Sequence, residues 1–285
     1  MLNALTIDVE DYFMVSAFAD TVKFDDWSKY ESRVEASTEL LLDRLDTHET
    51  KATFFTLGWI AERYPGLVKK IAARGHELAS HGYSHRLVYD LTPQVFREDT
   101  RKTKRIIEDV IGAEVVGYRA ASYSVTKRSL WALDILAEEG FIYDSSIFPI
   151  RHDRYGYIEF DRFSKIVELK NSRQILELPL STVRLFGRNL PVAGGGYLRL
   201  LPLKFIKWGL GNINRKEKRS AIIYLHPWEV DPGQPRINGS WLSCFRHNTN
   251  LKKTEQKLVE LMENFKFAPM KIVYADQIEE VKRGT

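Results

Sequence analysis

Short apolar runs alternate along this chain with longer segments in which apolar residues recur at helical spacing. The apolar runs predict strands at residues 5–10, 52–57, 77–80, 115–119, 141–144, 175–179 and 221–225. The periodic segments predict helices at residues 35–48, 59–74, 93–111, 129–139, 201–218 and 251–265. Regular alternation of this kind is typical of a parallel sheet built from β/α units.

The ends of several elements carry their own signals. Thr92 and Pro93 are typical of a helix start, and Gly112 is typical of the end of the same helix. Residues 231–250 are polar and contain Gly and Pro, so we expect a loop there, and residues 270–274 suggest a last strand.

Two histidines, His81 and His85, follow the predicted strand at residues 77–80. Gly82 loosens the backbone between them, so one turn can direct both imidazoles at one point. Imidazole is the commonest protein ligand for zinc and related metals, and a catalytic site of this type needs a third ligand, usually a carboxylate. The run Asp8-Val9-Glu10-Asp11 at the end of the first strand offers one.

Other polar residues also follow predicted strands. Besides Asp8, Glu10 and His81, they are Arg119, Asp144 and His226. The carboxyl ends of the strands meet on one face of a β/α barrel, where active sites lie. The pattern therefore predicts one polar site on that face.

Composition adds limits. The chain has 285 residues, 44% hydrophobic and 28% charged, with a net charge of +4, and nothing in it resembles a nucleic-acid module. Its one cysteine, Cys244, excludes an intrachain disulfide. Neither a secretory signal nor a run of about 20 apolar residues is apparent, so we expect a cytoplasmic protein.

Taken together, these motifs resemble the polysaccharide deacetylase family (carbohydrate esterase family 4, NodB homology domain). The matching stretches are residues 6–11, 81–85, 117–122 and 225–227. Asp8-Val9-Glu10-Asp11-Tyr12 and Ala193-Gly194-Gly195-Gly196-Tyr197 further resemble the subgroup linked to bacterial exopolysaccharide loci.

The resemblance implies an α/β fold, a distorted and incomplete (β/α) barrel of about seven strands. It implies a single domain over residues 1–285, in which residues 230–285 form a C-terminal extension packed on the barrel. The implied activity is hydrolysis of N-acetyl groups from an N-acetylated polysaccharide or its precursor.

The resemblance also implies a role for each site residue. Asp8 is the expected general base, and Arg119 is expected to pair with it and hold it ionised. His226 is the expected general acid, and the backbone N–H near Ser122 is expected to stabilise the oxyanion. A divalent metal, best matched by zinc, is expected on His81, His85 and a carboxylate.

The chain departs from the family pattern in places. The family has two adjacent aspartates where this chain has Asp8 and Glu10, which share one face of a strand, so Glu10 is the favoured metal ligand and Asp11 the alternative. Ala121 stands where the family usually has Pro. No clear match exists for the acidic residue that supports the late histidine, for which Asp144 and Glu177 are candidates.

Other features support weaker hypotheses. Tyr123, Tyr197 and Trp228 flank the motifs and could stack on sugar rings, although core packing is common for such residues. Residues 203–219 combine apolar and basic side chains, which would suit peripheral contact with a membrane at its inner face, although an ordinary barrel helix is favoured.

Two alternative functions fit the same residues. One is hydrolysis of sugar O-acetyl esters or small amides, which passes through the same kind of oxyanion. The other is a catalytically silent carbohydrate-binding protein. The presence of Asp8, both histidines, Arg119 and His226 argues against the second.

Overall fold

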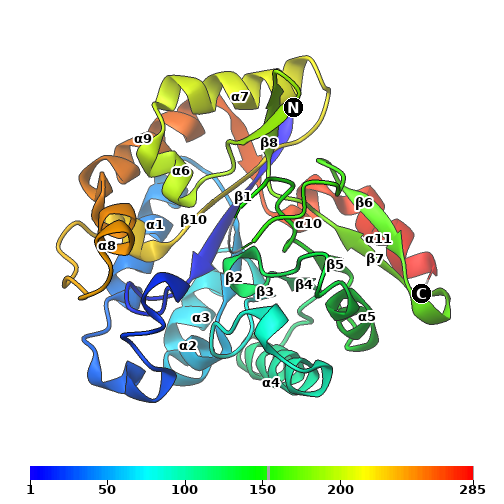
Figure 1. The fold of residues 1–285 in the computed structure, drawn as a ribbon, viewed down its shortest axis with the longest axis horizontal. Helices are drawn as coiled ribbons and strands as arrows, with labels where there is room; N and C mark the ends of the chain where they lie inside the picture. The colour runs from blue at the N-terminus through cyan, green and yellow to red at the C-terminus, as the bar shows by residue number, and fades with distance from the viewer. Residues whose placement is uncertain (153–154, 285) are drawn as a thin grey trace.

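A computed structural model describes residues 1–152 and 155–284 of the chain. One strongly curved sheet occupies the centre, and helices surround it (Figure 1). The N-terminus lies at the start of a central strand, and the described C-terminal residues form a helix beside the far edge of the sheet (Figure 1).

The strands are short, as expected for a β/α fold. In chain order they are β1 (Leu2–Val9), β2 (Thr53–Thr56), β3 (Glu77–Ser80), β4 (Gly117–Tyr118), β5 (Tyr143–Asp144), β6 (Lys165–Glu168), β7 (Gln174–Glu177), β8 (Thr182–Leu185), β9 (Arg188–Pro191), β10 (Ile222–Leu225) and β11 (Lys266–Ala268).

The α-helices of the described residues follow the strands. They are α1 (Val34–Thr47), α2 (Gly58–Arg63), α3 (Pro65–Ala73), α4 (Pro93–Ile111), α5 (Trp131–Glu138), α6 (Gly195–Leu200), α7 (Leu203–Arg215), α8 (Trp241–Asn248), α9 (Leu251–Asn264), α10 (Met270–Val273) and α11 (Ala275–Gly284). The 3-10 helices are η1 (Ser16–Phe18), η2 (Phe24–Lys29), η3 (Val88–Asp90), η4 (Ala121–Tyr123), η5 (Lys170–Ser172) and η6 (Pro227–Val230).

Parallel pairing dominates the sheet. Its strand order is β10-β1-β2-β3-β4-β5-β7-β6, and every neighbouring pair is parallel except β6 with β7. The seven consecutive parallel strands confirm the predicted α/β class.

The two ends of the sheet approach each other through a connecting segment and not by direct strand pairing. Ile222 donates its backbone N–H to Ser181 Oγ at 2.7 Å, and Tyr224 donates to Ala193 O at 2.6 Å. Gly194 then forms an isolated parallel bridge with Tyr224. The barrel is therefore incomplete, as predicted.

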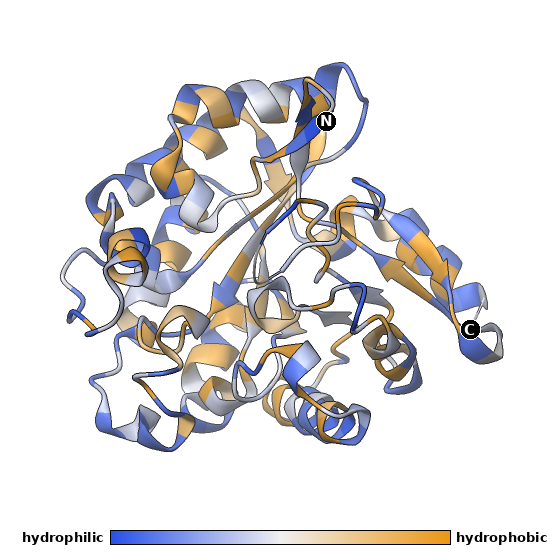
Figure 2. Ribbon diagram, in the orientation of Figure 1, coloured by the Kyte–Doolittle hydropathy of each residue, from blue (hydrophilic) through white to orange (hydrophobic). Residues whose placement is uncertain are grey.

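Burial explains why the apolar runs are continuous. All residues of β2, β3 and β10 are buried, and so are seven of the eight residues of β1. Parallel strands covered by helices on the outside have no polar face. Figure 2 shows the apolar residues gathered on the central strands and on the inward sides of the helices.

Helix α4 shows how local signals set the boundaries. Thr92 accepts a hydrogen bond from Val95 N at 3.3 Å, and Gly112 ends the helix with φ of 67°. Both positions were predicted from the sequence. The pattern of residues 59–74 likewise divides at Pro65, where α3 begins.

Two local predictions were wrong. Residues 231–250 are not entirely a loop, because Ser240 caps helix α8 by accepting from Ser243 N. Residues 270–274 begin with helix α10, and the last strand is β11, which pairs with the start of β1. Helix α6 starts within the Gly194–Gly196 stretch, at Gly195.

The C-terminal residues lie against the sheet. Besides the pairing of β11 with β1, helix α10 contacts β1, and α11 contacts β7. Among the described residues, no helix is both long and apolar enough to cross a membrane.

Gly194 offers a test of the nearly closed barrel. Its φ is +127°, and an added Cβ would lie 1.9 Å from Tyr224 O. We predict that Gly194→Ala lowers the midpoint of thermal unfolding clearly, because backbone atoms must move apart and the conformation is strained. Gly66→Ala is the matched control, since nothing lies within 4 Å of its added Cβ, and it should leave the midpoint unchanged or raise it. Equal midpoints for both variants would contradict the prediction.

Candidate active site

Three potential metal ligands meet at the carboxyl ends of β1 and β3. Ligand atoms of Glu10, His81 and His85 all lie within 4.8 Å of one another. Glu10 follows the last residue of β1, and His81 follows the last residue of β3. The structure thus brings together the three residues favoured from the sequence.

The turn that carries the two histidines is shaped by its backbone and by one carboxylate. Gly82 has φ of 72° and His85 has φ of 53°, so the chain reverses sharply between the imidazoles. Asp99 on α4 accepts a hydrogen bond from Tyr83 N at 2.9 Å and fixes the middle of the turn. His81 Nδ1 lies 2.8 Å from Arg119 O, which leaves its Nε2 for the metal.

The charges of this cluster suit a divalent cation. Burial alone would raise the pKa of Glu10, but His85 and His226 hold that pKa well below its usual range, so the carboxylate is anionic. Burial lowers the pKa of His81 to about 4, which keeps it neutral. Neutral imidazole and carboxylate are the forms that bind metal.

One carboxylate oxygen of Glu10 has the surroundings of a metal ligand. Its Oε2 is buried without a hydrogen-bond partner among the described residues, although it lies 2.9 Å from His85 Nε2. A metal ion shared by Glu10 Oε2 and His85 Nε2 would need these two atoms close together and free of a hydrogen bond to each other. The residues present therefore fit a metal with two nitrogen ligands and one oxygen ligand.

Asp11 has a different role, and its alternative assignment as the metal carboxylate is wrong. Its Oδ2 accepts hydrogen bonds from Ser32 Oγ at 2.8 Å, from Arg33 N at 2.8 Å and from Val34 N at 3.1 Å. Asp11 thus binds the start of helix α1, where N–H groups lack helical partners.

Asp8 is held by a fully buried arginine. Arg119 donates from Nη1 to Asp8 Oδ1 at 2.6 Å and to Thr6 Oγ1 at 2.7 Å. Its other nitrogens donate to the backbone and side chain of Ser145 at 3.2 and 3.0 Å. The pairing of Asp8 with Arg119 expected from the sequence is present, and every nitrogen of the guanidinium has a partner.

The loop after β4 borders Asp8 from another direction. Ser122 and Tyr123 have φ of 49° and 53°, two consecutive non-glycine residues in the left-handed region. Such conformations are costly and cluster at functional sites. The Tyr123 hydroxyl donates to Asp8 Oδ2 at 3.3 Å, and the ring is buried, so Tyr123 is not the open stacking surface predicted from the sequence.

His226 has an acidic partner that sequence reasoning missed. Its Nδ1 lies 2.9 Å from Glu229 Oε2, while its Nε2 lies 3.4 Å from Glu10 Oε1 and 4.0 Å from Asp8 Oδ2. Burial alone would lower the pKa of His226, but Glu10 and Glu229 raise it to about 9. His226 is therefore protonated at neutral pH.

Glu229 is itself fixed by a buried arginine, Arg199 of α6. Arg199 Nε donates to Glu229 Oε1 at 2.5 Å, and its Nη1 donates to the carbonyl oxygens of Arg246, His247 and Thr249. Although burial opposes it, Arg199 and His226 lower the pKa of Glu229 to about 2. The spacing His226-Pro-Trp-Glu229 could have revealed Glu229, whereas no sequence signal pointed to Arg199.

Asp144 and Glu177 do not support His226, and both suggestions were wrong. They are paired across β5 and β7, where Asp144 Oδ1 accepts from Ser146 Oγ and Glu177 Oε1 accepts from Ile147 N. Burial raises the pKa of Asp144 to about 6, and burial with the Asp144 charge raises that of Glu177 far more. The pair therefore holds a proton at neutral pH and shapes the loop beside Arg119.

The predicted sugar-stacking aromatics have different surroundings. Trp228 lies between the rings of His226 and His247, with centroids 5.2 and 4.2 Å away, and donates to Glu10 Oε1 at 3.3 Å. It is buried and is thus not an open sugar platform. Tyr197 is half-buried, with its hydroxyl 3.4 Å from that of Tyr155.

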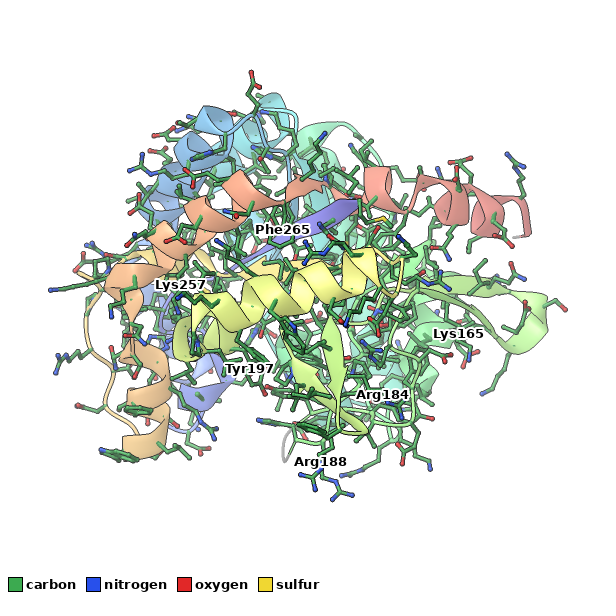
Figure 3. All side chains as sticks on the ribbon, turned by 90° about the horizontal axis from the view of Figure 1, so that it is seen from above. Lys165, Arg184, Arg188, Tyr197, Lys257 and Phe265 are labelled. Carbon is green, nitrogen blue, oxygen red and sulfur yellow. The ribbon has the colours of Figure 1, made fainter. Side chains whose placement is uncertain are left out.

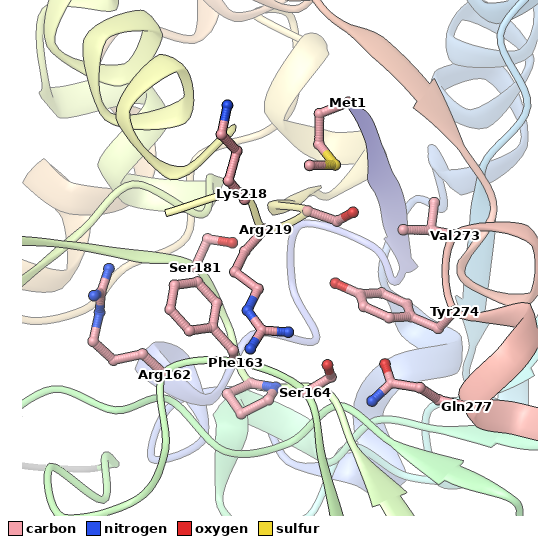
Figure 4. A pocket seen from close by; sticks show the side chains of 12 residues that line it. Met1, Arg162, Phe163, Ser164, Ser181, Lys218, Arg219, Val273, Tyr274 and Gln277 are labelled. Carbon is pink, nitrogen blue, oxygen red and sulfur yellow. The ribbon is translucent and has the colours of Figure 1, made fainter. Parts of the chain in front are cut away.

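A separate pocket lies where β1 begins, away from this cluster (Figure 4). Its lining includes Met1, Arg219, Tyr274 and Gln277, and it contains none of the site residues described above. The pocket is therefore distinct from the candidate active site.

Two family models match separate parts of the chain. Residues 21–138 match the model of the family described as polysaccharide deacetylase, and residues 145–275 match a model described as a domain of unknown function (DUF3473). Residues 21–138 are thus similar to polysaccharide deacetylases. Both matched stretches contribute strands to the same sheet, so the second is not a separate body.

Curated relatives match shorter stretches. A peptidoglycan-N-acetylglucosamine deacetylase of Bacillus cereus is 40% identical over 75 residues, which is 26% of this chain and 27% of that protein. A peptidoglycan deacetylase of Helicobacter pylori is 28% identical over 142 residues, 50% of this chain and 47% of that one. The chain thus spans about a quarter of the first of these relatives and about half of the second.

Solved structures match over nearly the whole chain. A protein of Pseudomonas aeruginosa assigned as a polysaccharide deacetylase superposes with a TM-score of 0.62 at 15% identity, covering 99% of this chain and 91% of that one. A similarly assigned protein of Mycobacterium smegmatis has a TM-score of 0.60 at 20% identity, covering 99% and 90%. At these identities the likeness establishes the fold.

Glu229→Gln tests the pairing of Glu229 with His226. The change removes one of the negative charges that raise the pKa of His226, so the protonated imidazole is lost at lower pH. We predict that the basic limb of the kcat profile against pH moves to lower pH, with Glu229→Asp partly restoring it. Glu217→Gln is the control, because Glu217 pairs with Arg162 and with none of the site residues. A basic limb that stays in place while only the rate falls would limit Glu229 to a structural role.

Proposed function

We propose that this protein is a metal-dependent deacetylase that hydrolyses N-acetyl groups of an N-acetylated glycan or its precursor. One arrangement carries the proposal. An aspartate paired with a buried arginine and a histidine paired with a buried glutamate both border one Glu–His–His cluster. The aspartate can serve as a base, the histidine as an acid, and the Glu–His–His cluster as the site of a Lewis-acid metal.

Glu10, His81 and His85 would hold the metal, which when bound polarises the acetyl carbonyl and makes water more acidic. Two nitrogen ligands and one oxygen ligand agree with zinc, and this donor set also admits other first-row metals.

Asp8 would act as the general base. It accepts the proton of the attacking water on the carboxylate oxygen that Arg119 does not occupy, Oδ2. Arg119 balances the charge of Asp8 and fixes its orientation, and the Tyr123 hydroxyl further restricts Oδ2. The backbone N–H near Ser122, in its unusual conformation, would face the developing oxyanion.

His226 would act as the general acid. A protonated imidazole whose Nδ1 is bound to Glu229 presents its Nε2 proton toward the cluster, where the leaving amine forms. Arg199 prevents Glu229 from turning away, because it binds the other carboxylate oxygen.

The proposal also covers the glycan substrate and the cell compartment. The Asp8–Tyr12 and Ala193–Tyr197 motifs support an exopolysaccharide or its lipid-linked precursor as the glycan. Cys244, the single cysteine, agrees with a cytoplasmic protein at the inner face of the membrane.

The direct test is acetate release from N-acetylglucosamine oligomers and from the producer's own exopolysaccharide. Release should stop on chelation and return when zinc is added. O-acetylated sugars with no N-acetyl group serve as the comparison, because the same residues can hydrolyse an ester. Release from the ester alone would replace the amide with an ester substrate, and no release from any glycan would contradict the proposal.

Two variants separate base from metal ligand. We predict that Asp8→Asn reduces turnover by at least about 10²-fold, the usual contribution of acid–base catalysis, while bound metal stays at the wild-type level. His81→Ala should lose metal, measured by elemental analysis after dialysis. Near-normal turnover of Asp8→Asn, or full metal content in His81→Ala, would contradict the corresponding role.

A further inference from the structure

Large apolar side chains are exposed at two separate tips of the molecule. Phe186, at the turn between β8 and β9, is 95% exposed. On α8, Trp241 is 77% exposed, and Leu242 and Phe245 are each 47% exposed. The rings of Trp241 and Phe245 stack at 5.5 Å with an angle of 14°, so they form one apolar surface. Folding alone does not explain such exposure.

Arginines surround both tips. Arg184 and Arg188 flank Phe186, while Arg246 follows Phe245 and Arg236 precedes α8. All four are exposed, and none forms an ion pair with a residue that the structure describes. The segments that carry the tips, residues 178–216 and 232–254, contain no Asp or Glu, although the chain has 38 acidic residues. Both tips therefore combine apolar side chains with unopposed positive charge.

The two tips extend from the body in the same direction. Figure 3 shows the β8–β9 hairpin, with Arg184 and Arg188 at its end, and helix α8 reaching toward the same side, with Tyr197 between them. Tyr197 connects this side of the molecule to the site. Its hydroxyl lies next to that of Tyr155. The Tyr155 ring in turn contacts Tyr123, which donates a hydrogen bond to Asp8.

Helix α8 is also tied to the site directly. His247 of α8 stacks on Trp228, which donates to Glu10. Arg199, which holds Glu229, binds the backbone at the end of α8. A surface that rests on α8 would therefore lie next to the catalytic cluster.

We propose that the β8–β9 tip and α8 dock this protein on an anionic lipid bilayer, with the candidate active site beside the membrane surface. Aromatic and aliphatic side chains enter the headgroup region, and the arginines bind the anionic headgroups. The proposal goes beyond the deacetylase function and does not depend on it.

The shape of the surface favours a bilayer over a protein or a glycan. Phe186 stands at the end of a hairpin and Leu242 is an aliphatic residue, and neither offers a concave ring-stacking site for a sugar. A bilayer accepts two projecting tips without a matching shape, whereas a protein partner needs a surface complementary to both.

This surface differs from the segment 203–219 suggested by sequence. Helix α7 buries Ile206, Leu210 and Ile213 against the body, as an ordinary barrel helix does. Its exposed aromatic is Trp208, 42% exposed. The proposed membrane contact therefore lies on α8 and the hairpin and not on α7.

Sedimentation with lipid vesicles tests the proposal. The full chain should bind vesicles of phosphatidylcholine mixed with phosphatidylglycerol, bind those of phosphatidylcholine alone much less, and be released by salt. The variants Arg184→Glu and Arg188→Glu each remove one arginine contact. Each should weaken partitioning of the protein onto the anionic vesicles by about fivefold or more. Phe186→Ser and Trp241→Ser should also weaken it. Ile272→Ser, which removes an apolar side chain 55% exposed on α10, is the matched control and should bind normally.

Other occupants give different results. Failure to bind anionic vesicles, or equal binding by wild type and the tip variants, would overturn the proposal. Retention on an N-acetylated glycan gel that Trp241→Ser abolishes, without vesicle binding, would assign the surface to glycan. A dimer that Phe186→Ser converts to monomer, again without vesicle binding, would assign it to a second copy of the chain. Acetate release from soluble glycan should be unchanged in Phe186→Ser, so this test is independent of the proposed activity.

Discussion

The buried ion pair between Arg119 and Asp8 is the interaction on which the site depends. Arg119 is fully buried and also binds Thr6 and Ser145, so it joins β1 to the loop after β5. Removing one partner of such a pair leaves a buried charge without a counter-charge, which lowers the free energy of unfolding by about 3–5 kcal/mol. The backbone carbonyl of Arg119 also orients the imidazole of His81. One residue thus fixes the candidate base and the tautomer of a candidate metal ligand.

A second buried pair repeats this arrangement on the acid side. Arg199 holds Glu229, and Glu229 holds His226. The two halves meet at Glu10, which lies near both His85 and His226. Positive and negative groups therefore alternate through the cluster. Each buried charge has a partner of opposite sign, which explains how so many ionisable groups can share a buried volume. The cluster also brings Asp8 and His226, the proposed base and acid, to a distance of 4.0 Å from each other.

Sequence patterns predicted the residues whose position follows from strand geometry. Asp8, Glu10, His81, Arg119 and His226 all lie at strand ends, because parallel strands place their carboxyl ends on one face. Residues whose function depends on side-chain direction were harder to predict. Asp11 and Trp228 adjoin the motifs, yet one binds α1 and the other packs between histidines. Arg199 reaches the site from a distant helix, which no local pattern records. Helix α8 was missed because it has only eight residues and follows a polar stretch that contains Gly and Pro.

The pairing of β1 with both β10 and β11 has a consequence for how the chain acquires its shape. Ala4 lies opposite Ile222 in one pair and opposite Ala268 in the other. During synthesis β2 soon follows β1, but more than two hundred residues must be made after β1 before β10 and β11 exist. During that time the edge of β1 that pairs with β10 is open, and an open apolar strand edge makes a nascent chain prone to aggregation. Contacts of such long range also slow folding, because a large loop has to close first. The strand that carries Asp8 is thus made long before its pairing is complete.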